Sequence, residues 1–271
     1  MAISPAGDPA RPGARLWLLR PAAAELSALS LAELDEAERR RAAGFVRAAD
    51  QVLYASAHIA LRRVLADRLG TAPQLVRLGR DRCPGCGGPH GRPVVLGAPF
   101  PLHFSLSHTN GLVLLGLAAV PLGVDVQVLA EDPRVAACAP VFHPVERAEL
   151  TRLDPTARRP AFTRLWARKE AHLKGVGTGV LRAALAEHYL GSGGPGAPAG
   201  PAGWTVLDIP CGPGHRAAAA IRSTDPGRVT VRWLELGRPA ARHAAPPGPT
   251  AHHLRPPHYH LARKELTDAL G

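Results

Sequence analysis

A nine-residue segment past the middle of the chain, WARKEAHLK at 166–174, contains an acid and a base at helical spacing. It has good helix formers and no internal breaker, so Glu170 and Lys174 share one face of the predicted helix. Gly175 suits the left-handed position that ends a helix. Taken alone, the pair is an ordinary surface ion pair worth roughly 0.3–0.5 kcal/mol. However, the only lysines are Lys169, Lys174 and Lys264, so composition does not explain two of them in one short helix.

A predicted strand at 124–128, VDVQV, carries a second acid. Its valines face the core, while Asp125 and Gln127 point together to the opposite side. One interpretation is a half-exposed edge strand. The other is a cation site built from oxygen donors, which Mg²⁺ prefers.

The segment before this strand predicts a hairpin. In PLHFSLSH at 101–108, Leu102, Phe104 and Leu106 face one way, and the histidine and serines, including Ser107, face the other. Asn110–Gly111 is a strong two-residue turn signal, and an apolar return strand follows at 112–120.

A cysteine pair, Cys83 and Cys86, precedes His90 in a loop rich in glycine and proline. Structural zinc needs four ligands, and neither Cys138 nor Cys211 has paired spacing. We interpret the segment as a tight loop with reduced thiols. Arg92, next in the loop, could present its guanidinium to a phosphate or to adenine.

The amino-acid composition limits the classes of binding partner but does not select one of them. The 271 residues carry a net charge of +11, with 46% hydrophobic and 20% charged residues, which is typical of a globular protein with a basic surface. We find no RNA-binding signature, no apolar run that could span a membrane and no signal peptide in residues 1–15. We therefore expect a cytoplasmic monomer that binds neither nucleic acid nor membrane.

The overall order is helices followed by strands, and it occurs twice along the chain, in two blocks. The first block has a strand at 15–20, a helix opened by the Ser30–Glu33 capping box and a helix at 49–69 ended by Gly70. The arginines along these helices are interpreted mainly as a solvated face: Arg39, Arg40, Arg41, Arg47, Arg62 and Arg63.

The second block begins after the strand at 124–128. It has a helix from His143, a helix at 158–174, an undecided segment at 180–190 and three strands at 204–208, 215–221 and 229–235, with the last two joined by a turn at 225–227. Loop 191–203 is of low complexity. We predict an α+β fold of two similar halves, 1–120 and 121–236, each a small, mostly antiparallel sheet packed on helices. Residues 237–271 are predicted to be a flexible tail with a short helix at 261–270.

Three segments, in this order and at these separations, resemble the Sfp-like, pseudodimeric 4′-phosphopantetheinyl transferases. They are FSLSHT at 104–109, GVDVQ at 123–127 and the 166–174 helix. The resemblance extends to FHPVE at 142–146, GRP at 91–93 and the start of the second helix at 45–47. It covers about residues 15–236, and the strand and the 166–174 helix are specific as a pair.

The resemblance implies an enzyme that moves the phosphopantetheine arm of coenzyme A onto a serine of an acyl or peptidyl carrier protein. Two similar halves would hold coenzyme A and Mg²⁺ in the cleft between them. Asp125 and Glu170 would bind the metal, Glu170 would also activate the serine, and Lys174 would stabilise charge on the phosphate. Ser107, His108 and Arg92 would hold coenzyme A phosphates, with Arg47 near the 3′-phosphate.

One departure concerns the metal. The family often has a second acid where this chain has Gln127, whose amide oxygen or a bound water would fill that position, so we expect a weaker or more permissive metal requirement. The positive charge suits an acidic carrier, but the fatty-acid, polyketide and nonribosomal-peptide systems are not distinguished. The alternatives are a non-catalytic protein that binds coenzyme A or a carrier and, ranked far lower, a zinc-bearing nucleic-acid binder built on Cys83, Cys86 and His90.

Overall fold

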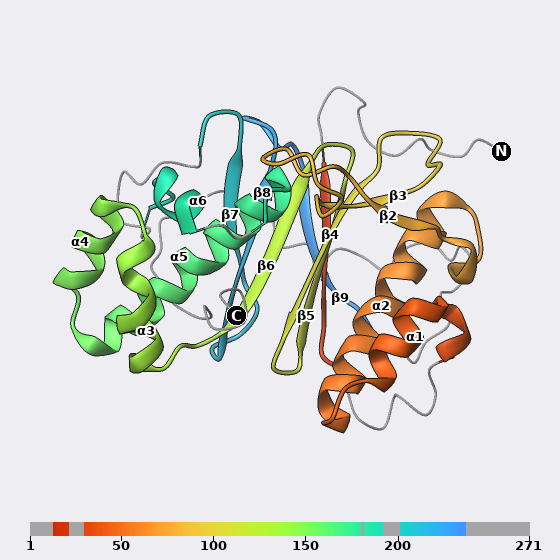
Figure 1. Ribbon diagram of the computed structural model, residues 1–271, viewed down its shortest axis with the longest axis horizontal. Helices are drawn as coiled ribbons and strands as arrows, with labels where there is room; N and C mark the ends of the chain where they lie inside the picture. The colour runs from red at the N-terminus through yellow and green to blue at the C-terminus, as the bar shows by residue number, and fades with distance from the viewer. Residues whose placement is uncertain (1–12, 22–29, 180–181, 192–200, 237–271) are drawn as a thin grey trace.

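Two small sheets lie at the centre of the computed structural model, and helices cover their outer faces (Figure 1). The structure describes residues 13–21, 30–179, 182–191 and 201–236. Four strands form the first sheet, in the order β4-β5-β1-β9, and three form the second, in the order β6-β8-β7. Their bounds are β1 (Ala14–Leu19), β4 (His103–Thr109), β5 (Leu112–Ala118), β6 (Leu122–Val128), β7 (Thr205–Ile209), β8 (His215–Ile221) and β9 (Val229–Trp233).

Helices α1 (Glu36–Ala43) and α2 (Ala48–Leu69) lie on the side of the first sheet (Figure 1). Short 3₁₀ turns, η2 (Leu31–Glu33) and η3 (Pro73–Leu75), flank them, and the small hairpin β2 (Leu78–Arg80) and β3 (Pro93–Val95) follows. Apolar residues of α2 pack against Phe104, Leu115 and Leu117 of the sheet. Gly70 ends α2 at φ +65°, as predicted.

The second sheet is covered by α5 (Pro155–Val176) together with shorter helices (Figure 1). These are α3 (Asp132–Cys138), η4 (Ala139–Val141), α4 (Pro144–Arg152) and α6 (Arg182–Glu187). Leu165, Trp166 and Ala171 of α5 are fully buried in this core. A separate apolar cluster fills the space between the two sheets, with Leu16, Leu114 and Val124 among its members. The predicted α+β class, with small and mostly antiparallel sheets on helices, is confirmed.

The two sheets meet where β4 runs beside β6, and serine side chains bridge them. The backbone N–H of Val124 donates to Ser105 Oγ at 3.0 Å, and that of Val126 donates to Ser107 Oγ at 3.3 Å. The predicted alternation of β4 is confirmed, and its polar face meets β6, where both serines are buried. The Asn110–Gly111 turn is also confirmed, with φ of +37° and +77°.

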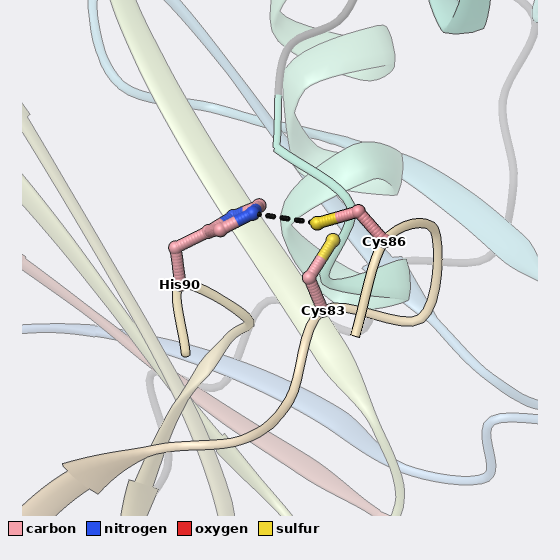
Figure 2. A group of neighbouring side chains, drawn as sticks. All are labelled: Cys83, Cys86 and His90. Carbon is pink, nitrogen blue, oxygen red and sulfur yellow. Dashed lines mark hydrogen bonds between the residues drawn. The ribbon is translucent and has the colours of Figure 1, made fainter. Parts of the chain in front are cut away.

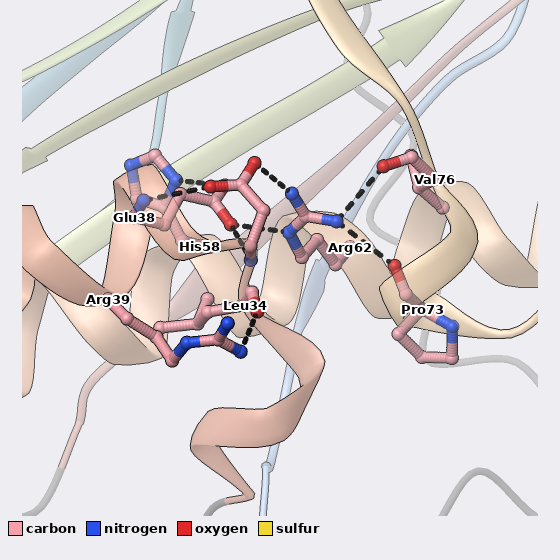
Figure 3. Close-up of polar contacts among 8 residues, drawn as sticks. Leu34, Glu38, Arg39, His58, Arg62, Pro73 and Val76 are labelled. Carbon is pink, nitrogen blue, oxygen red and sulfur yellow. Dashed lines mark hydrogen bonds and ion pairs between the residues drawn. The ribbon is translucent and has the colours of Figure 1, made fainter.

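Arg62 is buried beneath α1 and ties it to α2, contrary to the prediction of a solvated face at this position. Its guanidinium donates to Glu38 Oε2 and Asp35 Oδ2, both at 2.6 Å, and to the carbonyls of Pro73 and Val76 (Figure 3). A buried guanidinium needs this many partners to offset the loss of its hydration. Arg39, Arg40, Arg41 and Arg47 are exposed, as predicted.

Three further predictions are corrected. Ser30 makes no capping hydrogen bond, and the capping box of α1 is formed by Asp35 and Glu38. Helix α5 continues through Gly175 and ends at Gly177, which has φ +93°. The last two strands form no hairpin: β9 pairs in parallel with β1, so the final strand joins the first sheet.

Other predictions fall partly or wholly outside the described residues. Segment 180–190, left undecided between helix and strand, contains α6. Most of loop 191–203 and the predicted tail with its helix lie outside the described residues. Within the described part of the chain, no helix combines the length and the apolar character that a membrane span requires.

Candidate active site

Helix α5 crosses β6 with backbone nearly touching backbone, and two glycines make this possible. A Cβ atom at Gly123 would lie 2.0 Å from the carbonyl oxygen of Ala171 and 2.4 Å from the nitrogen of Gly175. A Cβ at Gly175 would in turn collide with Trp204. Because side chains two residues apart on a strand share a face, Asp125 points to the same side as Gly123, toward α5.

The close crossing brings five polar residues together, which we call the Asp125 cluster: Ser107, Asp125, Gln127, Glu170 and Lys174. Asp125 is its centre and is 1% exposed. Its Oδ1 accepts from Ser107 Oγ at 2.7 Å and from Lys174 Nζ at 2.5 Å, and its Oδ2 accepts from Gln127 Nε2 at 2.7 Å. Lys174 also donates to Ser107 Oγ at 3.2 Å. The cluster therefore joins β4, β6 and α5.

Glu170 is the second carboxylate of the cluster, and burial dominates its electrostatics. Burial raises the pKa of Glu170 to about 7, Lys174 opposes this rise, and Asp125 adds to it. Burial works against the charged form of Lys174 too, but Asp125 and Glu170 outweigh it and raise the pKa of the ammonium. Within the described residues, no hydrogen bond to the Glu170 carboxylate is formed. A carboxyl group that titrates near neutral pH is suited to accept and return a proton.

The donor set of the cluster fits a hard divalent cation. Asp125, Gln127 and Glu170 offer carboxylate and amide oxygens, which are the ligands that Mg²⁺ prefers. Gln127 Oε1 is buried and has no hydrogen-bond partner, and such an atom costs free energy unless something compensates it. The carboxyl group of Glu170, which is 8% exposed, accepts no hydrogen bond from the described residues. A cation between these oxygens would compensate the buried oxygen of Gln127.

Neither His108 nor Arg47 belongs to the cluster. The ring of Tyr54 of α2 contacts the His108 ring edge-on, with 6.3 Å between the ring centroids, and stacks on the His58 ring, with 4.2 Å between the centroids. Burial, followed by the positive fields of His58 and Lys174, lowers the pKa of His108 to about 4. His108 is therefore a neutral hydrogen-bonding group at physiological pH. Arg47, exposed at the start of α2, pairs with Asp50 at 2.7 Å.

Arg92 lines a cavity of about 770 Å³ that adjoins the end of α5. Its guanidinium donates to Asp81 and to the carbonyl of Gly175, all at 3.3 Å. Arg82 and Arg222 also line the cavity, against one acid, Asp81. This excess of guanidinium groups favours an anionic ligand. The cavity walls come from loop 81–92, the end of α5, residues 202–204 and two further positions, Pro121 and Arg222.

Lys169, the other lysine of the helix, serves a different purpose from Lys174. Its ammonium pairs with Glu146 at 2.8 Å and donates to the carbonyl of His188 at 2.6 Å, and both charged side chains are almost fully buried. Glu146 also accepts from the backbone of His143 and Leu190. Burial raises the pKa of Glu146 and lowers that of Lys169. The pair fastens α4 to α5, a role that residue spacing alone does not reveal.

The sequence-predicted site residues thus fall into three groups. Ser107, Asp125, Gln127, Glu170 and Lys174 share one cluster, although Ser107 donates to Asp125 in this arrangement. Arg92 lies on the cavity wall. His108 lies outside the cluster but within the field of Lys174, and Arg47 pairs with Asp50 at the start of α2. Nothing in the sequence singled out Tyr54. Its ring makes an edge-on contact with His108, but the apolar stripe of the 49–69 helix does not include it.

The family model and the relatives that match this chain all carry the name 4′-phosphopantetheinyl transferase. Residues 121–197 match the family model of the 4′-phosphopantetheinyl transferase superfamily. A Synechocystis sp. protein provisionally named 4′-phosphopantetheinyl transferase slr0495 is 29% identical over 153 residues, which is 54% of this chain and 58% of that protein. The 4′-phosphopantetheinyl transferase gsp of Aneurinibacillus migulanus is 29% identical over 92 residues, or 34% of this chain and 37% of its own length.

A third relative, the 4′-phosphopantetheinyl transferase psf-1 of Bacillus pumilus, is 33% identical over 92 residues, covering 34% of this chain and 38% of that protein. The matches therefore span between about one third and three fifths of the relatives' lengths. The matched family region contains β6 and α5, the two elements that contribute four of the five residues of the Asp125 cluster.

Proposed function

We propose that this chain transfers the 4′-phosphopantetheine group of coenzyme A to a serine hydroxyl of an acyl or peptidyl carrier protein, because residues 121–197 match the family model of the 4′-phosphopantetheinyl transferase superfamily. The products would be the holo-carrier and adenosine 3′,5′-bisphosphate. One observation carries the proposal: Asp125 of β6 meets Glu170 and Lys174 of α5, 45 and 49 residues away, in one cluster where both acids are buried and Lys174 is 33% exposed.

Asp125, Glu170 and Gln127 would hold a Mg²⁺ ion, since they are the oxygen donors of the cluster. When bound, the ion would neutralise negative charge on the diphosphate of coenzyme A. Gln127 supplies a neutral oxygen where an acid would give a charged one, so the site would bind the ion more weakly than a site with three acids. None of the five residues of the Asp125 cluster lines the cavity at the end of α5, but its excess of arginine supports an anionic part of coenzyme A there, with Arg92 contacting the carbonyl of Gly175.

Glu170 would accept the proton of the carrier serine. The serine oxygen forms a bond to the β-phosphorus of coenzyme A, the bond from that phosphorus to the bridging oxygen breaks, and the proton moves to a carboxylate oxygen of Glu170. A pKa near 7 suits this task, because about half of the carboxyl groups are then ionised at neutral pH and the carboxylate still has affinity for a proton. Lys174 would stabilise the charge that develops on the leaving phosphate.

Ser107, His108, Arg92 and Arg47 would position coenzyme A. Ser107 and His108 are neutral donors at the start of the β4–β5 turn, and Arg92 and Arg47 provide guanidinium groups for the phosphates. Arg47 already pairs with an exposed partner, Asp50, so a phosphate has only to displace a surface ion pair worth little. The net charge of +11 supports an acidic carrier as partner.

The test is to incubate the full-length protein with coenzyme A, Mg²⁺ and a panel of apo carrier domains and to measure the intact mass of each carrier. A gain equal to one phosphopantetheine group on serine supports the proposal. Glu170→Gln should lower the rate by about 10²–10⁴-fold, whereas the matched control Asp67→Asn, an exposed acid on α2, should not change it. Gln127→Glu should lower the Mg²⁺ concentration required.

The alternative is a protein that binds coenzyme A or a carrier without catalysis, and the amide at position 127 is the observation that favours it. Under that alternative, calorimetry would detect coenzyme A binding, but no carrier in the panel would gain mass at any Mg²⁺ concentration. Retained turnover in Glu170→Gln would instead exclude Glu170 as the base.

A further inference from the structure

The loop between β2 and β3 gathers three metal-ligating side chains that the proposed transfer reaction does not use. The donor atoms of Cys83, Cys86 and His90 all lie within 4.8 Å of one another. Figure 2 shows the two sulfur atoms side by side, with the His90 ring directed toward them. Cys86 Sγ lies 2.9 Å from His90 Nε2. The sequence alone favoured a tight loop with no ligand, because three donors are one fewer than structural zinc requires.

The backbone of the loop is closed in a way that presents these donors together. The N–H of Cys83 donates to the carbonyl of Gly88 at 2.7 Å, and the N–H of Gly87 donates back to the carbonyl of Cys83 at 2.8 Å. Gly87 has φ +72°, and a Cβ at Gly88 would lie 3.0 Å from the His90 ring and 3.3 Å from the Cys86 sulfur. The glycines therefore leave the space in which the imidazole and the thiol meet.

The geometry points to a tetrahedral zinc ion at this place. We propose that Cys83 Sγ, Cys86 Sγ and one ring nitrogen of His90 bind Zn²⁺, with a water molecule or another exogenous ligand as the fourth. Two thiolates and an imidazole are a set that zinc favours over hard cations. Around a tetrahedral zinc, the ligand atoms are about 3.5–3.8 Å apart, from Zn–S of about 2.3 Å and Zn–N of about 2.0 Å. The sulfur–nitrogen contact needs to open by only about 0.6 Å to reach this geometry.

The other two cysteines lie elsewhere. Cys138 is buried in the core beneath α5, and Cys211 is buried between the two sheets. Neither belongs to the group of donors, which among the described residues contains only Cys83, Cys86 and His90. Cys211 is therefore a suitable control for the loss of a thiol without the loss of a ligand.

The ion would fix one wall of the cavity. The loop touches the end of α5, where Cys83 Sγ lies 4.0 Å from the carbonyl oxygen of Thr178. Pro84, inside the Cys83–Cys86 turn, and Arg82 and Arg92, on either side of the donors, line the cavity. Joining residues 83, 86 and 90 through one ion removes freedom from the segment that carries both arginines. This inference does not depend on which reaction the protein catalyses.

The test begins with the metal content of the full-length protein, purified under reducing conditions and measured by plasma mass spectrometry. We expect about one zinc ion per chain. Cys83→Ala, Cys86→Ala and His90→Ala should each retain roughly tenfold less zinc after dialysis against a mild chelator, while Cys211→Ala should retain the wild-type amount. Zinc retained equally by all three ligand variants would overturn the proposal, because it would place the ion elsewhere.

Two measurements on the wild-type protein test the proposal without any substitution, so they apply even if a variant does not fold. Replacement of zinc by Co²⁺ should give the thiolate-to-cobalt absorption of a tetrahedral sulfur site. A strong chelator should raise the reactivity of the exposed Cys86 thiol toward a disulfide reagent and lower the unfolding temperature, and added zinc should reverse both changes. A protein that takes up no zinc on titration, or that forms a Cys83–Cys86 disulfide under reducing conditions, refutes the proposal.

Discussion

The substitution Gly123→Ala tests whether the close crossing of α5 over β6 builds the Asp125 cluster. The new methyl group would lie 2.0 Å from the carbonyl oxygen of Ala171, whereas ordinary van der Waals contact begins at 3.4 Å. The helix must therefore move away by about 1.4 Å, since both clashing groups are backbone atoms and cannot rotate aside. That movement is large beside the 2.5 Å that separates Lys174 Nζ from Asp125 Oδ1.

The expected result has two parts. Overpacking at this backbone contact should lower the free energy of unfolding by about 1–3 kcal/mol. Displacement of Glu170 and Lys174 by about an ångström should lower the rate of phosphopantetheine transfer, per folded molecule, by about 100-fold. Urea unfolding measures the first effect, and carrier-mass kinetics at saturating coenzyme A measure the second.

Gly116→Ala is the matched control. A Cβ at Gly116 would also be crowded, at 2.7 Å from the side chains of Leu122 and Val124, but it lies in the core between the sheets, on the opposite face of β6 from α5. We expect a similar loss of stability with little change in transfer rate. Equal transfer rates in Gly123→Ala and Gly116→Ala, at comparable stability, would refute the account of how the site is positioned.

Three further outcomes follow from buried charges. Glu146→Ala should lower the free energy of unfolding by about 3–5 kcal/mol, because it leaves the Lys169 ammonium buried without its carboxylate, and urea denaturation checks this. Arg62→Ala should lower the free energy of unfolding by a smaller amount, because Glu38 of α1 loses its guanidinium partner but keeps His58 and the backbone N–H of Asp35, and amide hydrogen exchange should show the loss of protection concentrated in α1 and α2. Burial lowers the pKa of His172 to about 4 from an ordinary 6.5, so the unfolded chain binds this proton first as the pH falls. Stability should therefore drop by up to about 3 kcal/mol between pH 6.5 and 4; His172→Phe should flatten that part of the pH profile, and an unchanged slope would contradict the assignment.

The parts of the fold that depend on neighbouring residues could be predicted from the sequence. The β4–β5 hairpin follows from Asn110–Gly111, whose left-handed backbone suits a two-residue turn. The common direction of Asp125 and Gln127 follows from the period of a strand, and that of Glu170 and Lys174 from the turn of a helix. The meeting of these two pairs is a tertiary contact, and for that the sequence offered only a family resemblance.

The predictions that failed concern residues whose roles are set by distant parts of the chain. Gly175 has the right type to end α5, but Gly123 and Trp204 pack against it and the helix continues for two residues. Arg62 resembles its exposed neighbours in sequence and is buried only because η3 and α1 close over it.

The parallel pairing of β9 with β1 means that the first sheet cannot be separated from the second by cutting the chain between β5 and β6. Ala14–Leu18 pair with Val229–Trp233, and the backbone of Leu234 continues the ladder to Leu18. A fragment that stops before Val229 would leave an unpaired β1 edge open to association with other chains. On the ribosome, the first sheet would stay incomplete until nearly all of the described chain has been made, so we expect folding to wait for the late strand instead of proceeding half by half.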